Sequence, residues 1–266
     1  KYAVTVSDPS QIRYHMDKAI HLATTGRPGP VWLDVPLDMQ SKHIAPDQLP
    51  GFKPDVKDGA VLENDLSANV EQCIQMLKEA ERPVLISGYG IRLAKGEAEF
   101  IQLIEKLGIP VITSWTSSDL VPSSHELVVG RSGIFGDRAG NFAVQNSDLV
   151  LSVGSRLSVP QIGYNFPIFA RAAKKIVVDI DEAELKKPSV TPDLPVLADA
   201  KAFMSELINK WGEEPQLQID EWRNRCRSWR SKYPVVLPEY KEEKDAVNSF
   251  HFVDALSENL DESALV

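Results

Sequence analysis

The sequence predicts an α/β protein built on a doubly wound parallel sheet of six strands, with helical extensions at both ends. Two observations lead to this fold class. Short, continuously apolar segments alternate with amphipathic helical segments between residues 64 and 211. Strands that are apolar throughout are typical of a parallel sheet covered by helices on both faces. Right-handed crossovers then wind such a sheet in two directions, which gives a Rossmann-like domain.

Six strands are expected where apolar runs end in small or polar residues. They are Pro83–Ser87, Pro110–Thr113, Leu127–Gly130, Leu149–Gly154, Lys175–Asp179 and Pro195–Ala198. Helices are expected where apolar residues recur every three or four positions. They cover residues 67–80, 94–107, 139–146 and 202–211, and a polar helix over 219–232 follows. The arginines of this polar helix are expected to form a solvated face; they are Arg223, Arg225, Arg227 and Arg230.

Both ends of the chain carry elements outside this sheet. A helical pattern stops at Gly26, two prolines fix a tight turn, and an apolar strand then ends at Pro36. Residues 41–62 are rich in Pro, Asp and Lys and are expected to form a linker. A last helix is expected from Val247 to Leu260, and residues 263–266 look like the start of a strand. The sequence thus predicts that the chain divides into five regions, which are residues 1–40, 41–62, 63–212, 213–246 and 247–266.

Composition and charge exclude several classes of partner. The chain of 266 residues carries 38 acidic against 29 basic residues, a net charge of −9, and it has no long basic run. A nucleic-acid or anionic-membrane partner is therefore not expected. No apolar stretch approaches the ~20 residues that a membrane-spanning helix needs. The two cysteines, Cys73 and Cys226, lie far apart in helical patterns, which indicates buried thiols in a reducing, cytoplasmic environment.

Three loops that follow predicted strands carry candidate ligand-binding residues, because ligands of open parallel sheets bind at the carboxyl ends of the strands. The first loop, Gly88–Gly90, allows a tight turn and lets backbone amides approach a phosphate. A purely structural turn explains these glycines equally well. The second loop is Gly154–Arg156. Its arginine is suited either to a diphosphate group or to a surface ion pair.

The third loop follows the strand that ends at Asp179. A carboxylate at this place accepts both hydroxyls of an adenosine ribose, whereas Asp181 is suited to cap the next helix. Asp199, which follows the last strand, has the same two interpretations. Ser114 and Trp115 complete the rim of the expected site, and packing alone also explains Trp115.

Five stretches of the chain have a more specific pattern than a parallel sheet requires. They are Gly26–Asp38, Asn141–Leu151, Gly154–Leu157, Phe169–Lys175 and Asp179–Leu185. Together they resemble thiamin diphosphate (ThDP)-dependent enzymes, most of all the acetolactate synthase group. The resemblance implies that residues 1–40 are the C-terminal remnant of the pyrimidine-binding domain. It also implies that 41–62 are a linker, 63–212 the central Rossmann-like domain, 213–246 a helix and linker, and 247–266 the start of the diphosphate-binding domain.

The same resemblance implies a function for the whole enzyme. It would use ThDP and Mg²⁺ to decarboxylate a 2-keto acid such as pyruvate and to join the product to an acceptor, as a transferase or lyase that works as a homodimer or homotetramer. The activating glutamate and the Gly-Asp-Gly motif of such enzymes are absent from this chain. The chain is therefore expected to be a scaffold or nucleotide-binding domain that has no catalytic or metal-binding residues and is inactive alone.

In acetolactate synthases the central domain holds FAD, and in several relatives it holds ADP or nothing. The cofactor-binding positions carried over are Gly88, Tyr89, Gly90, Ser114, Gly154, Ser155, Arg156, Asp179 and Ile180. One departure counts against FAD: Arg156 is followed by the stretch Leu157–Pro160, where acetolactate synthases have an Asp-rich stretch. One alternative is a free-standing module of the same fold that binds FAD or an adenine nucleotide, and the Gly26–Asp38 segment counts against it. Another is a structural domain without a ligand.

Overall fold

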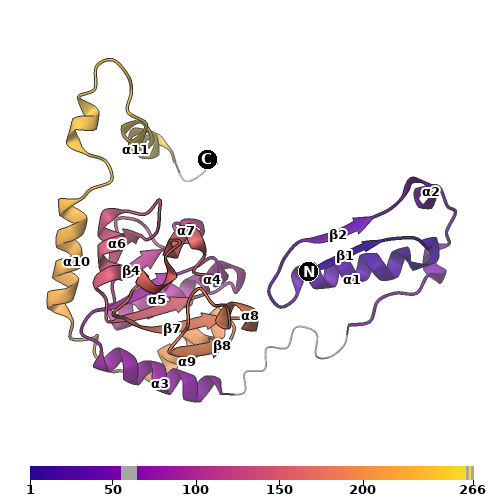
Figure 1. Cartoon of the computed structure of the whole chain (residues 1–266), viewed down its shortest axis with the longest axis horizontal. Helices are drawn as coiled ribbons and strands as arrows, with labels where there is room; N and C mark the ends of the chain where they lie inside the picture. The colour runs from indigo at the N-terminus through magenta and orange to yellow at the C-terminus, as the bar shows by residue number, and fades with distance from the viewer. Residues whose placement is uncertain (55–64, 262–263, 265–266) are drawn as a thin grey trace.

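A parallel sheet of six strands organises the central part of the chain in the computed structural model, which describes residues 1–54, 65–261 and 264 (Figure 1). The strands are β3 (Pro83–Ser87), β4 (Val111–Thr113), β5 (Val128–Arg131), β6 (Leu149–Val153), β7 (Lys174–Asp179) and β8 (Leu194–Leu197). Their spatial order is β5-β4-β3-β6-β7-β8, and all neighbours are parallel. The winding direction therefore reverses between β3 and β6, and the predicted doubly wound α/β fold is confirmed.

Helices precede, connect and follow the strands, and those that cover the sheet lie in two layers. They are α3 (Leu66–Glu79), α4 (Gly90–Leu93), α5 (Glu97–Leu107), α6 (Arg138–Asn146), α7 (Val159–Ile162), α8 (Glu182–Leu185), α9 (Ala200–Trp211), α10 (Asp220–Lys232) and α11 (Ser249–Asn259). Helices α3 and α5 both pack against α9, whereas α6 packs against α10. Among the described residues, no helix is long and apolar enough to cross a lipid bilayer.

The two central strands form the middle of the hydrophobic core. Every residue of β3 and of β6 is buried, as their continuously apolar sequences require. Leu77 of α3, Phe100 of α5 and Phe203 of α9 are fully buried in the same core. Ala143 of α6 and Cys226 of α10 are buried in the core from the other layer, so the sheet is fixed on both faces and the loops at the strand ends start from rigidly placed points.

The structure differs from the sequence prediction in several elements, among them three short helices that were not predicted, over Leu37–Gln40, Gly90–Leu93 and Val159–Ile162. The helix expected over 94–107 begins only at Glu97, because Lys95 before it has a positive φ of 54°; a residue in that conformation does not continue a right-handed helix. A strand not indicated by the sequence, β1 (Tyr2–Thr5), is too short to show a clear alternation. Of the predicted strand start at 263–266, all but Ala264 lies outside the described residues, as do residues 55–62 of the predicted linker.

The N-terminal elements form a small unit beside the central domain. Strand β1 pairs in parallel with β2 (Val31–Asp34), and α1 (Ile12–Thr24) contacts both strands. The short helix α2 (Leu37–Gln40) follows β2. The first part of the linker folds back on α1, where the ring of Phe52 lies against Tyr14 and His21. Figure 1 shows this unit on the side of the sheet where α8 lies.

Helix α10 is part of the packed core, which therefore continues past residue 212. Trp222 and Cys226 are buried in that core, and Trp222 Nε1 donates a hydrogen bond to Pro83 O at 2.9 Å. The expectation of a fully solvated arginine face is wrong for two residues. Arg230 donates to the backbone oxygens of residues 123, 125 and 128, and Arg223 donates to that of residue 108. These bonds anchor α10 to the loops before β4 and β5.

The docking of α10 can be tested with two tryptophan substitutions. Trp222→Ala removes a side chain that is 5% exposed and its hydrogen bond to β3, so we expect a loss of about 3–5 kcal/mol in the free energy of unfolding. Trp115→Ala, at a position that is 67% exposed in the same domain, is the matched control and should cost far less. Urea denaturation measures both, and equal losses would contradict the packing described for α10.

Candidate functional site

One cavity of about 700 Å³ runs along the carboxyl ends of all six strands. Loops that follow each strand contribute to its wall, and so does the turn Gly26–Gly29 of the N-terminal unit. All nine cofactor-binding positions predicted from the sequence line this cavity: Gly88, Tyr89, Gly90, Ser114, Gly154, Ser155, Arg156, Asp179 and Ile180. The structure thus brings together residues that are up to 92 positions apart in the chain, because parallel strands end at one edge of the sheet.

The floor of the cavity is formed by two glycine loops that touch backbone to backbone. A β-carbon added at Gly88 would lie 2.2 Å from Gly154 O, and one at Gly90 would lie 2.7 Å from Gly154 Cα. The amide of Gly88 donates to Val153 O at 3.0 Å, and that of Gly90 donates to Gly154 O at 2.9 Å. The expectation that these two amides are available to a phosphate is therefore wrong. The glycines instead allow the two central loops to approach each other.

Asp179 occupies the carboxyl end of β7, where only 7% of it is exposed. Burial raises the pKa of this carboxyl group, although a hydrogen bond from the amide of Asp181 to Oδ1, at 2.9 Å, acts in the opposite direction. Asp181 itself caps α8 by accepting from the amide of Ala183 at 3.0 Å, so its predicted role as a helix cap is confirmed. A buried carboxylate at a strand end is suited to accept the hydroxyls of a ribose.

Three cationic side chains converge on Glu184 beside Asp179. Arg27 Nη1 and Arg156 Nε both lie 2.8 Å from Glu184 Oε1, and Lys187 Nζ lies 3.0 Å from Oε2. Burial raises the pKa of Glu184, but the hydrogen bonds from Arg27, Lys187 and Arg156 outweigh it and lower the pKa to about 2. Arg156 is thus both an ion-pair partner and, with 66% of its side chain exposed, part of the cavity wall.

Arg27 is a wall residue that the sequence prediction missed. Its guanidinium bridges Glu184 and, at 2.9 Å, Asp181, and so joins the N-terminal turn to the start of α8. The signal in the sequence was weak, because the Gly-Pro pattern around Arg27 indicates a turn without indicating what the turn contacts. Other wall residues that were missed include Thr116, Arg131, Ser132, Phe135, Pro160 and Gln161.

The ion cluster around Glu184 predicts a pH-dependent contribution to stability. A carboxyl group whose pKa falls from 4.5 to about 2 on folding stabilises the protein above pH 4.5, and this contribution disappears as the pH falls towards 2. Glu184→Gln should therefore lower the melting temperature at pH 7. The difference in melting temperature between this variant and the wild type should become smaller below pH 4.5. Glu182→Gln, at an exposed position on the same helix, is the control. An effect of Glu184→Gln that stays constant from pH 7 to 3 would contradict the cluster.

Comparison with known proteins defines the class to which this fold and cavity belong. Residues 70–207, just over half of the chain, match the family described as thiamine pyrophosphate enzyme, central domain. The chain therefore belongs to the thiamine pyrophosphate (ThDP) enzymes, and the predicted membership is confirmed.

The relatives within this class include acetolactate synthases. The chain is 32% identical to the acetolactate synthase large subunit of Corynebacterium glutamicum over 88% of its own length and 37% of the relative. It is 34% identical to the probable acetolactate synthase large subunit of Methanocaldococcus jannaschii, over 78% of this chain and 35% of the relative. It is also 30% identical to the chloroplastic acetolactate synthase of Arabidopsis thaliana, over 100% of this chain and 39% of the relative. The chain thus spans well under half of the length of these curated relatives.

The cavity combines a buried carboxyl group, two guanidinium groups and a floor of glycines. Asp179 offers a buried acceptor, Arg27 and Arg156 offer cations, and the glycines of the floor carry no side chains, although the adjacent Tyr89 and Ser155 also line the cavity. In the parts of the chain that the structure describes, no three His, Cys, Asp or Glu side chains gather as a metal site requires.

Proposed function

We propose that this chain is the central part of a ThDP- and Mg²⁺-dependent enzyme of the acetolactate synthase type, and that its cavity binds an adenine nucleotide, either ADP or the ADP moiety of FAD. The observation that carries the nucleotide proposal is the placement of all nine predicted positions on one cavity at the strand-order reversal. Doubly wound sheets bind nucleotides at that place. The family match and the acetolactate synthase relatives support the enzyme class.

The whole enzyme would decarboxylate a 2-keto acid and join the remaining fragment to an acceptor. Bound ThDP supplies the electron sink for the loss of carbon dioxide. The residues of this chain would contribute by forming the rigid sheet and holding the nucleotide, and the chain alone would be inactive. Assembly as a homodimer or homotetramer and a cytoplasmic location remain part of the proposal.

Each part of the cavity has a separate role towards the nucleotide. The Asp179 carboxylate would accept the ribose hydroxyls, and its charge would repel a 2′-phosphate. Arg27 and Arg156 place two guanidinium groups next to the expected diphosphate, where each can exchange part of its interaction with Glu184 for the ligand. The floor of Gly88, Gly90 and Gly154 would let the diphosphate lie close to the backbone.

A free-standing nucleotide-binding module is the second candidate. The relatives count against it, because the match to the Arabidopsis enzyme covers the whole chain, including the N-terminal unit. The contact of Arg27 with Asp181 and Glu184 also makes that unit part of the cavity wall.

Calorimetric titration of the 266-residue chain with ADP tests the proposal. Arg156→Ala should weaken ADP binding by about tenfold to a hundredfold, since a charge-assisted contact is worth roughly 1.5–3 kcal/mol. Asp179→Ala should weaken ADP while sparing inorganic diphosphate. Arg225→Ala, at an exposed position of α10, is the matched control for Arg156.

Two outcomes of this titration would contradict the proposal. One is the absence of binding and of thermal stabilisation by ADP and FAD at millimolar concentrations, which would leave the domain as a scaffold. The other is micromolar binding of ThDP with Mg²⁺, which would place the thiamin site within this chain.

A further inference from the structure

The outer face of α10 and the adjoining part of α6 carry cationic and aromatic side chains that the proposed function does not use. None of them lines the cavity at the strand ends. We call this surface the basic-aromatic patch, and it consists of Arg138, Phe142, Arg225, Trp229, Lys232 and Tyr233. We propose that the patch docks an acidic segment of a partner protein, whose carboxylates pair with the cations while an apolar side chain of the same segment covers the rings. The proposal is independent of the nucleotide that we propose for the cavity.

Three aromatic rings form the base of the patch. The ring centroid of Phe142 lies 5.8 Å from that of Trp229 and 5.5 Å from that of Tyr233. Trp229 in turn meets the core residue Trp222 edge to face, with centroids 5.7 Å apart. Phe142 is 37% exposed, whereas Trp229 and Tyr233 are half-buried. The core therefore holds the rings in place, and part of their apolar surface still faces solvent.

Three exposed cations lie over these rings. The guanidinium carbon of Arg225 is 5.9 Å from the ring centroid of Trp229, and that of Arg138 is 5.6 Å from the ring centroid of Tyr233. Lys232 Nζ lies 5.5 Å from the same Tyr233 ring. The rings attract the cations but carry no net charge, so the positive charge is not neutralised. Among the residues that the structure describes, these three cationic side chains make no hydrogen bond and no ion pair.

The other arginines of α10 already have acceptors. Arg227 Nη2 lies 2.8 Å from Glu126 Oε2, and Arg223 Nη2 lies 2.6 Å from Asp220 Oδ1. Arg230 donates to the backbone oxygens of residues 123, 125 and 128. On this helix, which the structure describes in full, the cations without an acceptor are thus those of the basic-aromatic patch. A carboxylate that binds there gains an ion pair without breaking an existing one.

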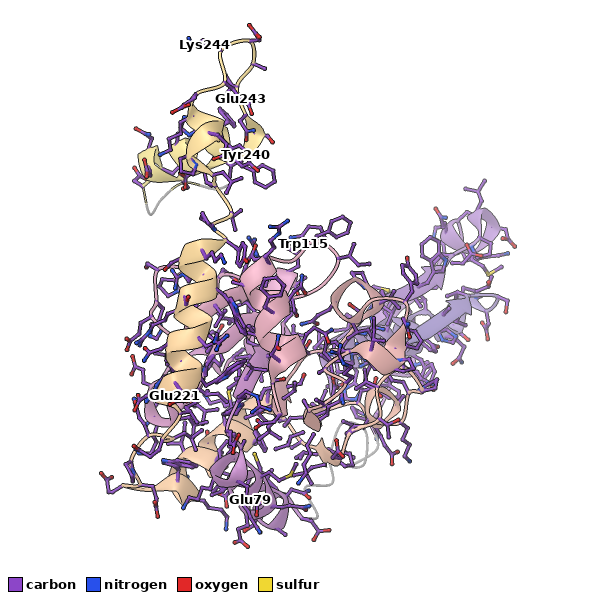
Figure 2. All side chains as sticks on the ribbon, turned by 60° about the vertical axis from the view of Figure 1, so that its left-hand side comes forward. Glu79, Trp115, Glu221, Tyr240, Glu243 and Lys244 are labelled. Carbon is purple, nitrogen blue, oxygen red and sulfur yellow. The ribbon has the colours of Figure 1, made fainter. Side chains whose placement is uncertain are left out.

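An open groove of about 580 Å³ follows the same face of α10. Arg225, Trp229, Lys232 and Tyr233 line it, and Glu221 lines its other end. Figure 2 shows α10 at the outer surface of the molecule, with Glu221 near the start of the helix. Arg225 and Lys232 are two helical turns apart, or about 10 Å along the helix axis. This spacing is the length of about three residues of an extended peptide.

The composition of the patch favours a polypeptide over another kind of polyanion. Trp, Tyr, Phe and Arg are the residue types enriched at the centres of protein interfaces. A guanidinium group matches a carboxylate through two parallel hydrogen bonds, and apolar side chains cover aromatic rings. The net charge of −9 on the whole chain opposes the approach of a long polyanion such as a nucleic acid. A short segment that combines a few carboxylates with an apolar side chain matches both features of the patch.

Selection from a library of random peptides tests the proposal without assuming the identity of the partner. The library is panned on the wild-type chain and, in parallel, on the double variant Arg138→Glu/Arg225→Glu. Both positions are exposed, so the double variant should melt at the wild-type temperature while its patch has lost its positive charge. We expect peptides that are enriched on the wild type alone, and that combine Asp or Glu with an aromatic or aliphatic residue.

Fluorescence anisotropy then measures the affinity of the most enriched peptide. Arg225→Gln should weaken binding about fivefold, which is the upper range for an exposed ion pair. Arg227→Gln is the matched control, because Arg227 is an exposed arginine of the same helix that is paired with Glu126, and it should leave the affinity within twofold. Replacing the apolar residues of the peptide by serine should weaken binding at least fivefold, and added salt should weaken it further.

Several outcomes would overturn the docking proposal. One is that no peptide distinguishes the wild type from the double variant, and another is that Arg227→Gln weakens the peptide as much as Arg225→Gln does. Tighter binding of a single-stranded oligonucleotide than of the peptide, lost in the double variant, would make the partner a nucleic acid. A wild-type dimer in analytical ultracentrifugation that the double variant dissociates would show instead that a second copy of this chain covers the patch.

Discussion

The contact between the backbones of two glycine loops is the constraint on which the rest of this structure depends. Gly88 and Gly90 follow β3, Gly154 follows β6, and no β-carbon can be accommodated between them. The winding direction of the sheet reverses between these two strands. The contact therefore lies at the middle of the carboxyl edge, and the loops that follow the other strands lie on either side of it. The cavity above this contact has Asp179 and the cations Arg27 and Arg156 towards β7, and the aromatic rings of Trp115 and Phe135 towards β4 and β5.

Charge connects the N-terminal unit to this floor. Arg27 comes from a turn more than 150 residues before α8, yet it shares Glu184 with Arg156 and Lys187. Glu184 keeps its charge well into the acid range because three cations surround it. Asp179 is affected in the opposite direction, since burial raises its pKa. On the proposed function, a diphosphate that drew Arg27 away from Glu184 would couple binding at this end to the position of the Gly26–Gly29 turn.

The sequence was sufficient for the features that local pattern and topology determine. Apolar runs located all six strands, and the rule that parallel strands share a carboxyl edge brought Gly88, Arg156 and Asp179 to one cavity. It was insufficient where loops contact one another. Phe135 and Gln161 both line the site, and the loops that carry them are joined by the hydrogen bond from the amide of Ile134 to Pro160 O. The spacing of apolar residues in the sequence does not indicate a contact of this kind between loops. The sequence also does not show that the amides of Gly88 and Gly90 are occupied, since their acceptors are Val153 O at the end of β6 and Gly154 O in the loop that follows it.

The central claim is that loops from both halves of the sheet and the N-terminal turn form one nucleotide site. Hydrogen–deuterium exchange with and without saturating FAD tests it most directly, because it reports every loop of the unmodified chain at once. Slower exchange is expected with FAD in all peptides that cover 26–29, 114–116, 131–135 and 154–161, with no change in α10. Protection confined to a single loop, or found in α10 and α11 instead, would contradict it.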